Sequence, residues 1–587
     1  MSRRLLALLL AGVLAGAGCA SATPVPSAGP TATGLAPSHQ PTPGTAGAAT
    51  PAPTTARPVD ITTTTYRPEP VGHAGGTLTI GTNVTPPPTS QLPFGWVEWP
   101  LAMVSLWDVT PDDRYVPQLA TQVPTIANGG VVLRSDGRMD VTIDLVPGAR
   151  WSDGQPITCE DLDHQADLTS GIGILDVEGA SGPRCVAHFV RPSLDYLHLW
   201  FPLLPAHYLE GRDLAEPYPT TDVALGVYGG PYMPTRVAEG KEIHFVPNPQ
   251  YWATIGKGEP PFDSVVIRYY RTSDAEIAAF ADGEVDVALD LMSPDLPKVA
   301  SFPPGQVDAI DAAVSMSTIW NRAALVAAWG EAGAGAILQA LHYAYDKQAI
   351  ADRVLAGVVD PVCNPVSALL WYHADTGSCY GYDPARANQI LDAAGFARGP
   401  DGVRARDGKP LAFRTCTEEA PGMAGQVRID VLTLLGRQLD EVGIRLNPPL
   451  ATEHLWAVGG QVETETACNF YRGTFDVALV AWPPYQEPPT YFIHYYHTPS
   501  KGDENWSRVE SEVVDRVFDS IETSVDFAAI RDAMGVFQAY AADPANGFPE
   551  IPLYQVKAAL LRGPRMHNVS ATWAYPTWNI ADWWRAP

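Results

Sequence analysis

The 587-residue sequence lacks the short patterns that usually carry catalysis or bind metals. It contains no His-Glu-x-x-His, no Gly-x-Ser-x-Gly, no Cys-x-x-Cys and no local pairing of cysteine with histidine. These patterns are typical of zinc proteases, serine hydrolases, zinc sites and thiol chemistry. Their absence argues against an exported hydrolase and predicts no metal site and no cofactor. His494 and His497 form the only close histidine pair, and a lone pair of this kind is typical of a surface loop.

Positive charge is scarce, because 38 Lys and Arg residues stand against 65 Asp and Glu residues, for a net charge of −27. Such a chain is a poor partner for nucleic acid or for an anionic membrane surface, although net charge does not define the charge of a binding cleft. Beyond the N-terminal leader, no apolar run suggests a bilayer span, which needs about 20 residues. No segment repeats with a period of about 20 to 50 residues, which excludes solenoids and propellers.

The N-terminus has the order of a secretory signal. Ser2–Arg4 is basic, Leu5–Leu14 is almost wholly apolar, and small residues lead to Cys19. A cysteine in this place resembles the lipobox of bacterial lipoproteins, in which the thiol is diacylated and becomes the first mature residue. Gly16 departs from that pattern, since these boxes usually carry leucine there. Ordinary secretion with cleavage after Ala22 is the alternative.

Residues 20–74 are rich in Pro, Thr, Ala, Ser and Gly, with hardly any large apolar residue before Tyr66. Such a composition cannot bury enough surface to offset the entropy of ordering, and proline stiffens it. The sequence therefore predicts a disordered tether between a lipid anchor at Cys19 and a globular body that begins near residue 75.

Apart from Cys19, the chain has an even number of cysteines, which favours disulfides in an exported protein. Pairing in sequence order closes the shortest loops, and each bridge contributes roughly 2–4 kcal/mol of stability. The predicted bridges are Cys159–Cys185, Cys363–Cys379 and Cys416–Cys468, and the alternative is buried free thiols.

Beyond the tether, alternating segments and helical segments follow one another, which is typical of a mixed α/β body. Residues 76–81 and 139–145 alternate like half-buried strands, and residues 475–481 are apolar enough for the centre of a sheet. Apolar residues recur at helical spacing over 337–345 and 429–442.

A series of short segments along this body forms an ordered set of motifs. They are Trp151–Thr158, Gly229–Tyr232, Asn248–Trp252, Phe280–Asp286, Ala344–Lys347, Tyr382–Pro384, Ala394–Phe396 and Asp407–Lys409. In this order they resemble the bacterial extracellular solute-binding proteins, family 5, the peptide, dipeptide and nickel-binding group of ABC transporters. The resemblance covers residues 75–587. Asp-Gly pairs and Gly-Pro turns have ordinary structural reasons, so the motifs indicate the fold and not the ligand site.

The resemblance implies an α/β, two-lobed, periplasmic-binding-protein-like fold of type II, with an extra subdomain on the first lobe. Two crossovers join the lobes of such proteins, and the ligand is enclosed between them. The expected parts are lobe 1 at 75–315, its subdomain at about 117–205, lobe 2 at 316–555, a return to lobe 1 at 556–587, and crossovers near 315–321 and 551–557.

The resemblance also implies a function. It predicts a monomeric substrate-binding lipoprotein of an ABC importer, held on the extracytoplasmic face of the cell membrane by its lipid. Such a protein captures a peptide or similar small solute and delivers it to permease subunits, without enzymatic chemistry. A related lipoprotein that binds a sugar or another non-peptide solute, and an envelope factor that has lost ligand binding, are the alternatives.

By the same resemblance, four stretches line the ligand: the loop after the first strand, the segment after residues 283–286, the loop after the central strand of lobe 2, and the return crossover. The candidate residues there are Trp96, Asp290, Leu291, Trp482, Tyr485, Glu487 and Tyr554. Aromatic rings suit a site that must grip and release a ligand, since a ring offers contact area with little rotamer entropy to lose. Core packing is the alternative for the aromatic residues.

The loop that starts at Trp482 departs from the family pattern. Oligopeptide-binding relatives carry an aspartate between the tryptophan and a Tyr-x-Glu-Pro run, and it pairs with the peptide ammonium group. Tyr485–Pro488 keeps the run, but the aspartate is missing and the loop is shorter. Because an enclosed ammonium group without a counter-charge is costly, this loop weakens the expectation of a peptide ligand unless Glu487 supplies the charge.

Replacing the predicted lipid-bearing residue tests the anchor. In a Cys19→Ala variant we expect the protein to move from the membrane fraction to the aqueous fraction or the medium, because the cleaved N-terminus then has nothing to hold a bilayer. Cell fractionation with immunoblotting measures this, and Ser21→Ala is the matched control. Unchanged fractionation of Cys19→Ala would show that this residue carries no lipid.

Overall fold

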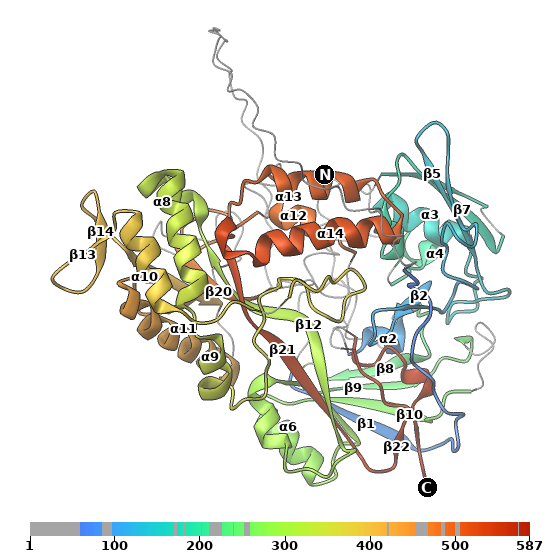
Figure 1. The fold of residues 1–587 in the computed structure, drawn as a ribbon. Coiled ribbons are helices and arrows are strands. Elements are labelled where there is room, and N and C mark those ends of the chain that lie inside the picture. Colours follow the sequence, from blue (N-terminus) through green and yellow to red (C-terminus); the bar gives the residue numbers. More distant parts are fainter. Residues whose placement is uncertain are drawn as a thin grey trace.

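A computed structural model describes most of the chain beyond residue 58 (Figure 1). The described residues are 59–84, 97–168, 173–179, 182–200, 202–210, 226–238, 240–251, 259–377, 379–418, 422–452, 455, 468–482, 488–498, 505–572 and 575–587. The predicted leader, Cys19 and the greater part of the predicted tether lie outside them.

A ten-stranded mixed sheet runs through the described part of the molecule, in the order β19-β17-β20-β12-β21-β11-β1-β10-β9-β8. Its strands are β1 (Thr77–Thr82), β8 (Tyr232–Ala238), β9 (Glu242–Pro247), β10 (Ser264–Tyr269), β11 (Val287–Met292), β12 (Val307–Trp320), β17 (Thr415–Glu418), β19 (Leu450–Thr452), β20 (Val477–Trp482) and β21 (Glu550–Arg562). The predicted strands at 76–81 and 475–481 are confirmed as β1 and β20.

Parallel pairs lie towards both ends of this sheet. β1 pairs in parallel with β10 and β11, and β17 pairs in parallel with β19 and β20. Parallel strands need crossover connections, which helices usually supply. Here α6 (Ser273–Ala281) connects β10 to β11, and α11 (Gly422–Val442) follows β17. The helix predicted over 429–442 is therefore confirmed.

The two strands at the centre of the sheet are the longest, with 14 residues in β12 and 13 in β21. They run antiparallel to each other, and the register shifts between Asp311 and Ser315. From Ser315 onward β12 also pairs with β20, whereas the far end of β21 pairs with β11. In Figure 1 both strands pass through the middle of the molecule, between α8, α10 and α11 on one side and β1, β9 and β10 on the other. The predicted crossovers fall within these strands, while the exact lobe boundaries stay a prediction.

A separate four-stranded antiparallel sheet lies within the predicted subdomain, in the order β4-β5-β7-β6. Its elements are β4 (Val131–Leu133), β5 (Met139–Asp144), β6 (Ile174–Glu178) and β7 (Arg184–Phe189), with α3 (Cys159–Leu168) between β5 and β6 in sequence. β5 alternates as predicted, because Met139, Val141 and Ile143 are buried and the residues between them are partly exposed.

The remaining helices and strands lie outside these two sheets, and some of them form small sheets of two or three strands. They are α2 (Trp99–Ala102), β2 (Trp107–Val109), β3 (Tyr115–Pro117), α4 (Ala206–Leu209), α7 (Leu296–Val299), α8 (Arg322–Ala344), α9 (Lys347–Val354), α10 (Pro384–Ala393), β13 (Ala397–Arg398), β14 (Arg404–Arg406), β15 (Lys409–Pro410), β16 (Ala412–Phe413), β18 (Arg445–Leu446), α12 (Tyr491–Tyr496), α13 (Glu512–Glu522), α14 (Phe527–Ala542), β22 (Met566–His567) and β23 (Trp584–Arg585).

Helix α8 is long and apolar enough to be compared with a membrane span. By length and composition it could cross a membrane, although no second apolar span was predicted. Gly330, with φ 70° and ψ 173°, interrupts it, so that α8 consists of two shorter helices. The second of these buries Ile337, Leu338 and Leu341 in the core beside the sheet, which is typical of a core helix.

The structure confirms the three predicted disulfides. Cys159 pairs with Cys185, Cys363 with Cys379 and Cys416 with Cys468. The first bridge joins α3 to β7 inside the subdomain, and the third starts from β17 in the large sheet. The second bridge closes a segment of the chain whose described residues belong to no helix or strand.

Residues 59–74, which the sequence assigns to the disordered tether, lie against the globular body. Ile61 is buried in the core, and the backbone N–H of Tyr115 donates to its carbonyl at 2.7 Å. The Tyr66 hydroxyl donates to Asp582 at 3.0 Å. Two large side chains in an otherwise polar stretch are enough to dock it, and the composition-based prediction overlooked them.

A buried carboxyl group lies at the start of β21, next to β12. Glu550 is 1 % exposed and accepts a hydrogen bond from the Tyr496 hydroxyl. Burial raises its pKa from 4.5 to about 7, against the lowering effect of hydrogen bonds from Tyr496 and Ser317. Because the pKa is higher in the folded protein, the contribution of Glu550 to stability is full below pH 4.5 and is lost as the pH rises through 7.

Glu550→Gln removes this ionisation, since glutamine still accepts from Tyr496 but carries no charge. We expect the variant to be more stable than the parent by roughly 2–3 kcal/mol at pH 8, and the difference to shrink towards pH 4.5. Denaturant unfolding across this pH range measures it, with exposed Glu512→Gln as the matched control. If the stability difference between Glu550→Gln and the parent were the same at every pH, the raised pKa of Glu550 would be contradicted.

Candidate functional site

The candidate ligand site lies at the carboxyl ends of the parallel strands β1 and β11. In open α/β sheets, ligands bind in the crevice outside the carboxyl ends of the strands. β1 ends at Thr82, and β11 ends at Met292 just after Asp290. Residues 85–96, with the candidate Trp96, follow β1 and lie outside the described residues.

Asp290 occupies a constrained position at this edge. Its φ is 60°, in the left-handed region that residues with a Cβ rarely adopt. Its carboxylate accepts a hydrogen bond from the Thr82 hydroxyl at 2.6 Å. Burial raises its pKa, and the Thr82 hydrogen bond offsets part of that effect. Unusual backbone at a partly buried carboxyl group is a reason to suspect a binding site.

Glu276 from α6 continues this polar network. The side-chain amide of Asn83 donates to Glu276 Oε2 at 2.8 Å and to the carbonyl of Asp290 at 3.1 Å. Glu276 Oε1 accepts from the backbone N–H of Leu289 at 2.9 Å. Burial raises the pKa of Glu276 well above its ordinary value, and the charge of Asp290 adds to that effect. The network fixes the first residues of the chain as it leaves β1 towards Trp96.

Two other candidate residues lie in the core. Leu291 is fully buried in a cluster with Phe280 and Leu561. Tyr554 is 2 % exposed, lies opposite Met316 on β12 and packs into the core beside α8. Their burial agrees with the core-packing alternative for Tyr554 and extends it to Leu291. A ligand contact by either residue stays a prediction.

The lobe-2 loop is described only at its edges. Trp482 is the last residue of β20, and its backbone lies opposite Ser315 on β12. The Trp482 side chain and residues 483–487, with Tyr485 and Glu487, lie outside the described part of the chain. The loop follows β20, a strand inside the large sheet, and its contacts stay a prediction.

An ion pair near Tyr554 was missed in the sequence. Arg428 on α11 donates from Nη1 to Glu418 Oε2 at 3.0 Å and to the Glu418 carbonyl at 3.3 Å. The Arg428 side chain is only 13 % exposed. Burial raises the pKa of Tyr554, and the positive charge of Arg428 partly opposes that increase. Glu418 is the last residue of β17, so the pair lies at the carboxyl end of a parallel strand. A charged residue directly after a β-rich segment was the available signal.

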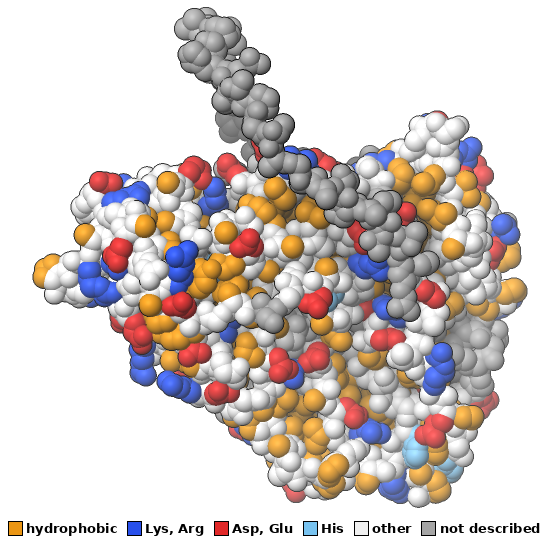
Figure 2. Space-filling model, viewed as in Figure 1, with side chains coloured by type: hydrophobic (Ala, Val, Ile, Leu, Met, Phe, Trp, Pro, Cys, Tyr) orange, Lys and Arg blue, Asp and Glu red, His pale blue; other side chains and the backbone are white. Residues whose placement is uncertain are grey.

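These groups give the carboxyl ends of the two sets of parallel strands different chemistry. The β1–β11 edge presents carboxyl groups, and the β17 edge presents a guanidinium group paired with a carboxylate. Charge-assisted hydrogen bonds from such groups are short and strong, so both edges suit a polar or charged solute. Figure 2 shows acidic and basic side chains interspersed over the visible face, so the negative net charge is not gathered there in one patch.

Among the residues that the structure describes, no group of three or more His, Cys, Asp and Glu residues could hold a metal ion. Of the close histidine pair, His494 lies on α12, and His497 pairs with Asp519 at 2.9 Å between Nε2 and Oδ1.

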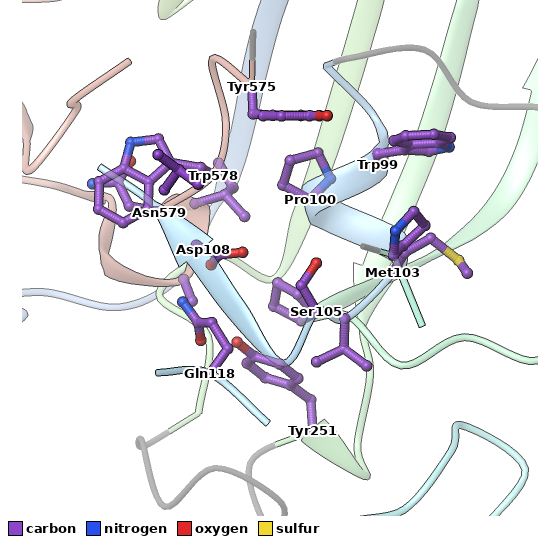
Figure 3. Close-up of a pocket in the computed structure, with 16 residues that line it drawn as sticks. Trp99, Pro100, Met103, Ser105, Asp108, Gln118, Tyr251, Tyr575, Trp578 and Asn579 are labelled. Atoms are coloured by element: carbon purple, nitrogen blue, oxygen red, sulfur yellow. The ribbon is translucent and has the colours of Figure 1, made fainter. Parts of the chain in front are cut away.

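A small cavity lies apart from these edges, between α2, β2 and the C-terminal segment. Figure 3 shows Trp99, Pro100, Tyr575 and Trp578 around it, with Asp108 on β2 near its centre. Its volume of about 30 Å³ has room for a few water molecules at most, since one water needs roughly 10–15 Å³. The cavity is therefore too small for a peptide or a sugar.

Comparison with known proteins agrees with the motifs. The family described as bacterial extracellular solute-binding proteins, family 5 Middle, matches residues 114–503. Protein XP55 of Streptomyces lividans is 29% identical over 313 residues, which cover 51% of this chain and 53% of that protein. Heme-binding protein A of Haemophilus influenzae is 28% identical over 173 residues, 29% of each chain. The chain thus spans about half the length, or less, of these curated relatives.

Solved structures share the fold over almost their whole length. The oligopeptide-binding protein AppA from Bacillus subtilis, in complex with a nonapeptide, has a TM-score of 0.65 at 18% identity and covers 88% of this chain and 100% of its own. NikZ from Campylobacter jejuni, in complex with Ni(L-His), has a TM-score of 0.66 at 18% identity and covers 87% of this chain and 99% of its own. The periplasmic EDTA-binding protein EppA has a TM-score of 0.69 at 20% identity and covers 88% of this chain and 98% of its own. The predicted two-lobed α/β fold is confirmed.

Proposed function

The chain belongs to the bacterial extracellular solute-binding proteins, family 5, and on this premise we propose that it is the substrate-binding lipoprotein of an ABC importer. It captures a peptide or a similar small solute between two lobes and delivers it to the permease, without catalysing a reaction. The observation that carries the proposal is the family match over residues 114–503, which includes β11, β17 and β20 of the candidate site, whereas β1 and β21 lie outside the matched range.

The sheet provides a mechanism for capture. β12 and β21 are the strands that connect the two groups of parallel strands, so a relative motion of the lobes must bend or twist them. The interrupted register between Asp311 and Ser315 is a natural place for such a bend. A ligand that contacts both lobes favours closure only by its higher affinity for the closed form. Moving closure from 1:99 to 99:1 takes a preference of about 10⁴, or roughly 5.5 kcal/mol.

The charged groups support a polar ligand. Arg428 and Glu418 can pair with a carboxylate and an ammonium group, respectively, and Asp290 offers a further acceptor across the sheet. A peptide or an amino-acid-like solute carries both groups. The solved relatives are complexes with a nonapeptide and with Ni(L-His), so this fold accepts peptides and small chelates alike. A sugar or another non-peptide solute is the alternative that the short loop after Trp482 favours.

The N-terminal leader supports the location. A lipid on Cys19 would hold the protein on the extracytoplasmic face of the cell membrane, where a permease collects its solute. Residues between Cys19 and the docked segment that begins at residue 59 would span the distance from the bilayer to the body. A monomer is sufficient for this function.

Mass spectrometry of small molecules released by denaturing the purified protein tests the proposal directly. We expect a peptide or a small polar solute, and adding it back should raise the melting temperature. A ligand at about 100 times its Kd stabilises the folded state by about 2.7 kcal/mol. If no solute is released and no peptide, sugar or chelate stabilises the protein, the envelope-factor alternative replaces the proposal.

Trp482→Ala tests the predicted stacking residue. We expect affinity for the identified solute to fall at least about tenfold, a loss of about 1.4 kcal/mol, because an aromatic contact is removed from an enclosed site. The melting temperature of the ligand-free variant should stay close to that of the parent. Titration calorimetry and X-ray scattering in both states measure affinity and compaction.

Trp584→Ala is the matched control, because Trp584 lies near the C-terminus and not in the candidate site. Its ring stacks on that of His567, with 3.9 Å between ring centroids. Unaltered affinity in Trp482→Ala, or a large loss of stability without ligand, would assign Trp482 to the core. No compaction with a saturating solute would remove the closing-lobe mechanism itself.

A further inference from the structure

Residues 59–74, called the strap from here on, are attached to the body by Ile61, whose carbonyl accepts from Tyr115, and at two further places. The first is the C-terminal segment. The Tyr66 hydroxyl donates to Asp582 at 3.0 Å and accepts from the side-chain amide of Asn579 at 2.7 Å. The Tyr66 ring also packs edge-on against Trp578, with 4.8 Å between ring centroids. These contacts hold the middle of the strap.

The second attachment is the turn between β2 and β3. Asp112 in this turn accepts hydrogen bonds from the Thr64 hydroxyl at 2.6 Å, from the Thr65 hydroxyl at 2.9 Å and from the Thr65 backbone N–H at 2.7 Å. Burial raises the pKa of Asp112, but hydrogen bonds from Thr110, Thr64 and Thr65 outweigh it and lower the pKa to about 2. Asp112 is therefore a fixed, ionised acceptor for the strap.

The next residue of the same turn reaches a distant part of the chain. Asp113 is 2 % exposed, and its Oδ2 accepts a hydrogen bond from the backbone N–H of Trp371 at 2.8 Å. Trp371 packs edge-on against Phe527 of α14, with 5.3 Å between ring centroids. Gln538 of α14 also donates to the carbonyl of Tyr372 at 2.8 Å. The turn belongs to the predicted first lobe, whereas α14 and the segment that carries Trp371 belong to the predicted second lobe.

The turn holds Asp113 in an unfavourable conformation. Its φ is 53°, in the left-handed region, where a side chain with a Cβ is crowded. Within the turn, Asp113 N–H donates to the Thr110 carbonyl at 2.9 Å, and Arg114 N–H donates to the Thr110 hydroxyl at 3.1 Å. The Thr110 hydroxyl in turn donates to Asp112 at 2.6 Å. Asp112 is thus shared between the turn and the strap, so that the strap supports the backbone that presents Asp113.

We propose that the strap positions Asp113 for the contact with Trp371, and so couples the N-terminal segment of the protein to the closure of its lobes. With the strap docked, Asp112 is fixed and Asp113 holds the second lobe through Trp371. When the strap is displaced, the turn loses its support, the contact with Trp371 weakens and the open form gains population. The proposal rests on the lobe closure of the proposed function, but it concerns the protein without ligand.

Two further contacts cross between the same lobes without involving the strap. Arg191 pairs with Glu522 at 2.9 Å, and the Thr490 hydroxyl donates to Asp195 at 3.1 Å. They explain why losing the strap should shift the equilibrium between open and closed forms without separating the lobes altogether.

Hydrogen exchange at the Trp371 amide, in ligand-free full-length protein made soluble by Cys19→Ala, tests the coupling. The strap variant is Thr64→Val with Thr65→Val, and its matched control is Thr62→Val with Thr63→Val, whose hydroxyls bond only Asp60 within the strap. We expect the strap variant to exchange this amide at least about fivefold faster than the parent, and the control to match the parent.

Asp113→Ala should have the same effect on exchange at the Trp371 amide. Asp113→Asn, which keeps an acceptor and tolerates the left-handed φ, should restore protection of that amide.

Spin labels on exposed Val132→Cys in β4 and Val536→Cys in α14 report the separation of the two parts in the same variants. We expect a larger population of long distances in the strap variant and in Asp113→Ala. Parent-like exchange and distances in the strap variant would overturn the proposal, and so would an unchanged Asp113→Ala. Faster exchange throughout β5 and β7 would indicate general unfolding and would equally overturn it. A failure to find a solute affects none of these outcomes.

Discussion

The antiparallel pairing of β12 with β21 is the interaction on which the rest of the structure depends. These strands are buried over most of their length and lie at the centre of the large sheet, between the parallel strands of the two lobes. Gln555 of β21 strengthens the pairing at the shifted register, where its side-chain amide donates to the carbonyls of Ala312 and Val314. Because both predicted crossovers run side by side in this pair of strands, the proposed motion of the lobes requires the pair to bend.

Four carboxyl groups that are buried or partly buried lie where distant elements meet. Asp290 and Glu276 lie near the carboxyl ends of β1 and β11, Glu550 lies at the start of β21, and Asp113 contacts Trp371. Burying a carboxyl group is unfavourable unless donors satisfy it, and each of these groups accepts at least one hydrogen bond from a neighbouring element. Because an unsatisfied buried carboxyl group is costly, each junction depends on one particular arrangement of its hydrogen-bond donors.

Much of the fold could be predicted from local patterns. Alternation of apolar residues located β1, β5 and β20, helical spacing located α11, and the order of short motifs indicated a two-lobed α/β fold. The three disulfides followed from sequence order, because closing the shortest loops is the least demanding arrangement. Local composition alone is insufficient where a few residues decide the outcome. Ile61 and Tyr66 hold a polar segment against the body, and Gly330 divides an apolar helix in two.

The sequence by itself determined several of the strands and helices, the disulfide pairing and the family, because each depends on neighbours along the chain or on the order of motifs. Only the tertiary structure decided which candidate residues are buried and which polar groups meet. Leu291 and Tyr554 carry no local signal that their side chains face the core. The contact of Asp113 with Trp371 joins positions 258 residues apart. Periodicity shows that a segment has two faces, but only the packing of distant strands determines what covers each face.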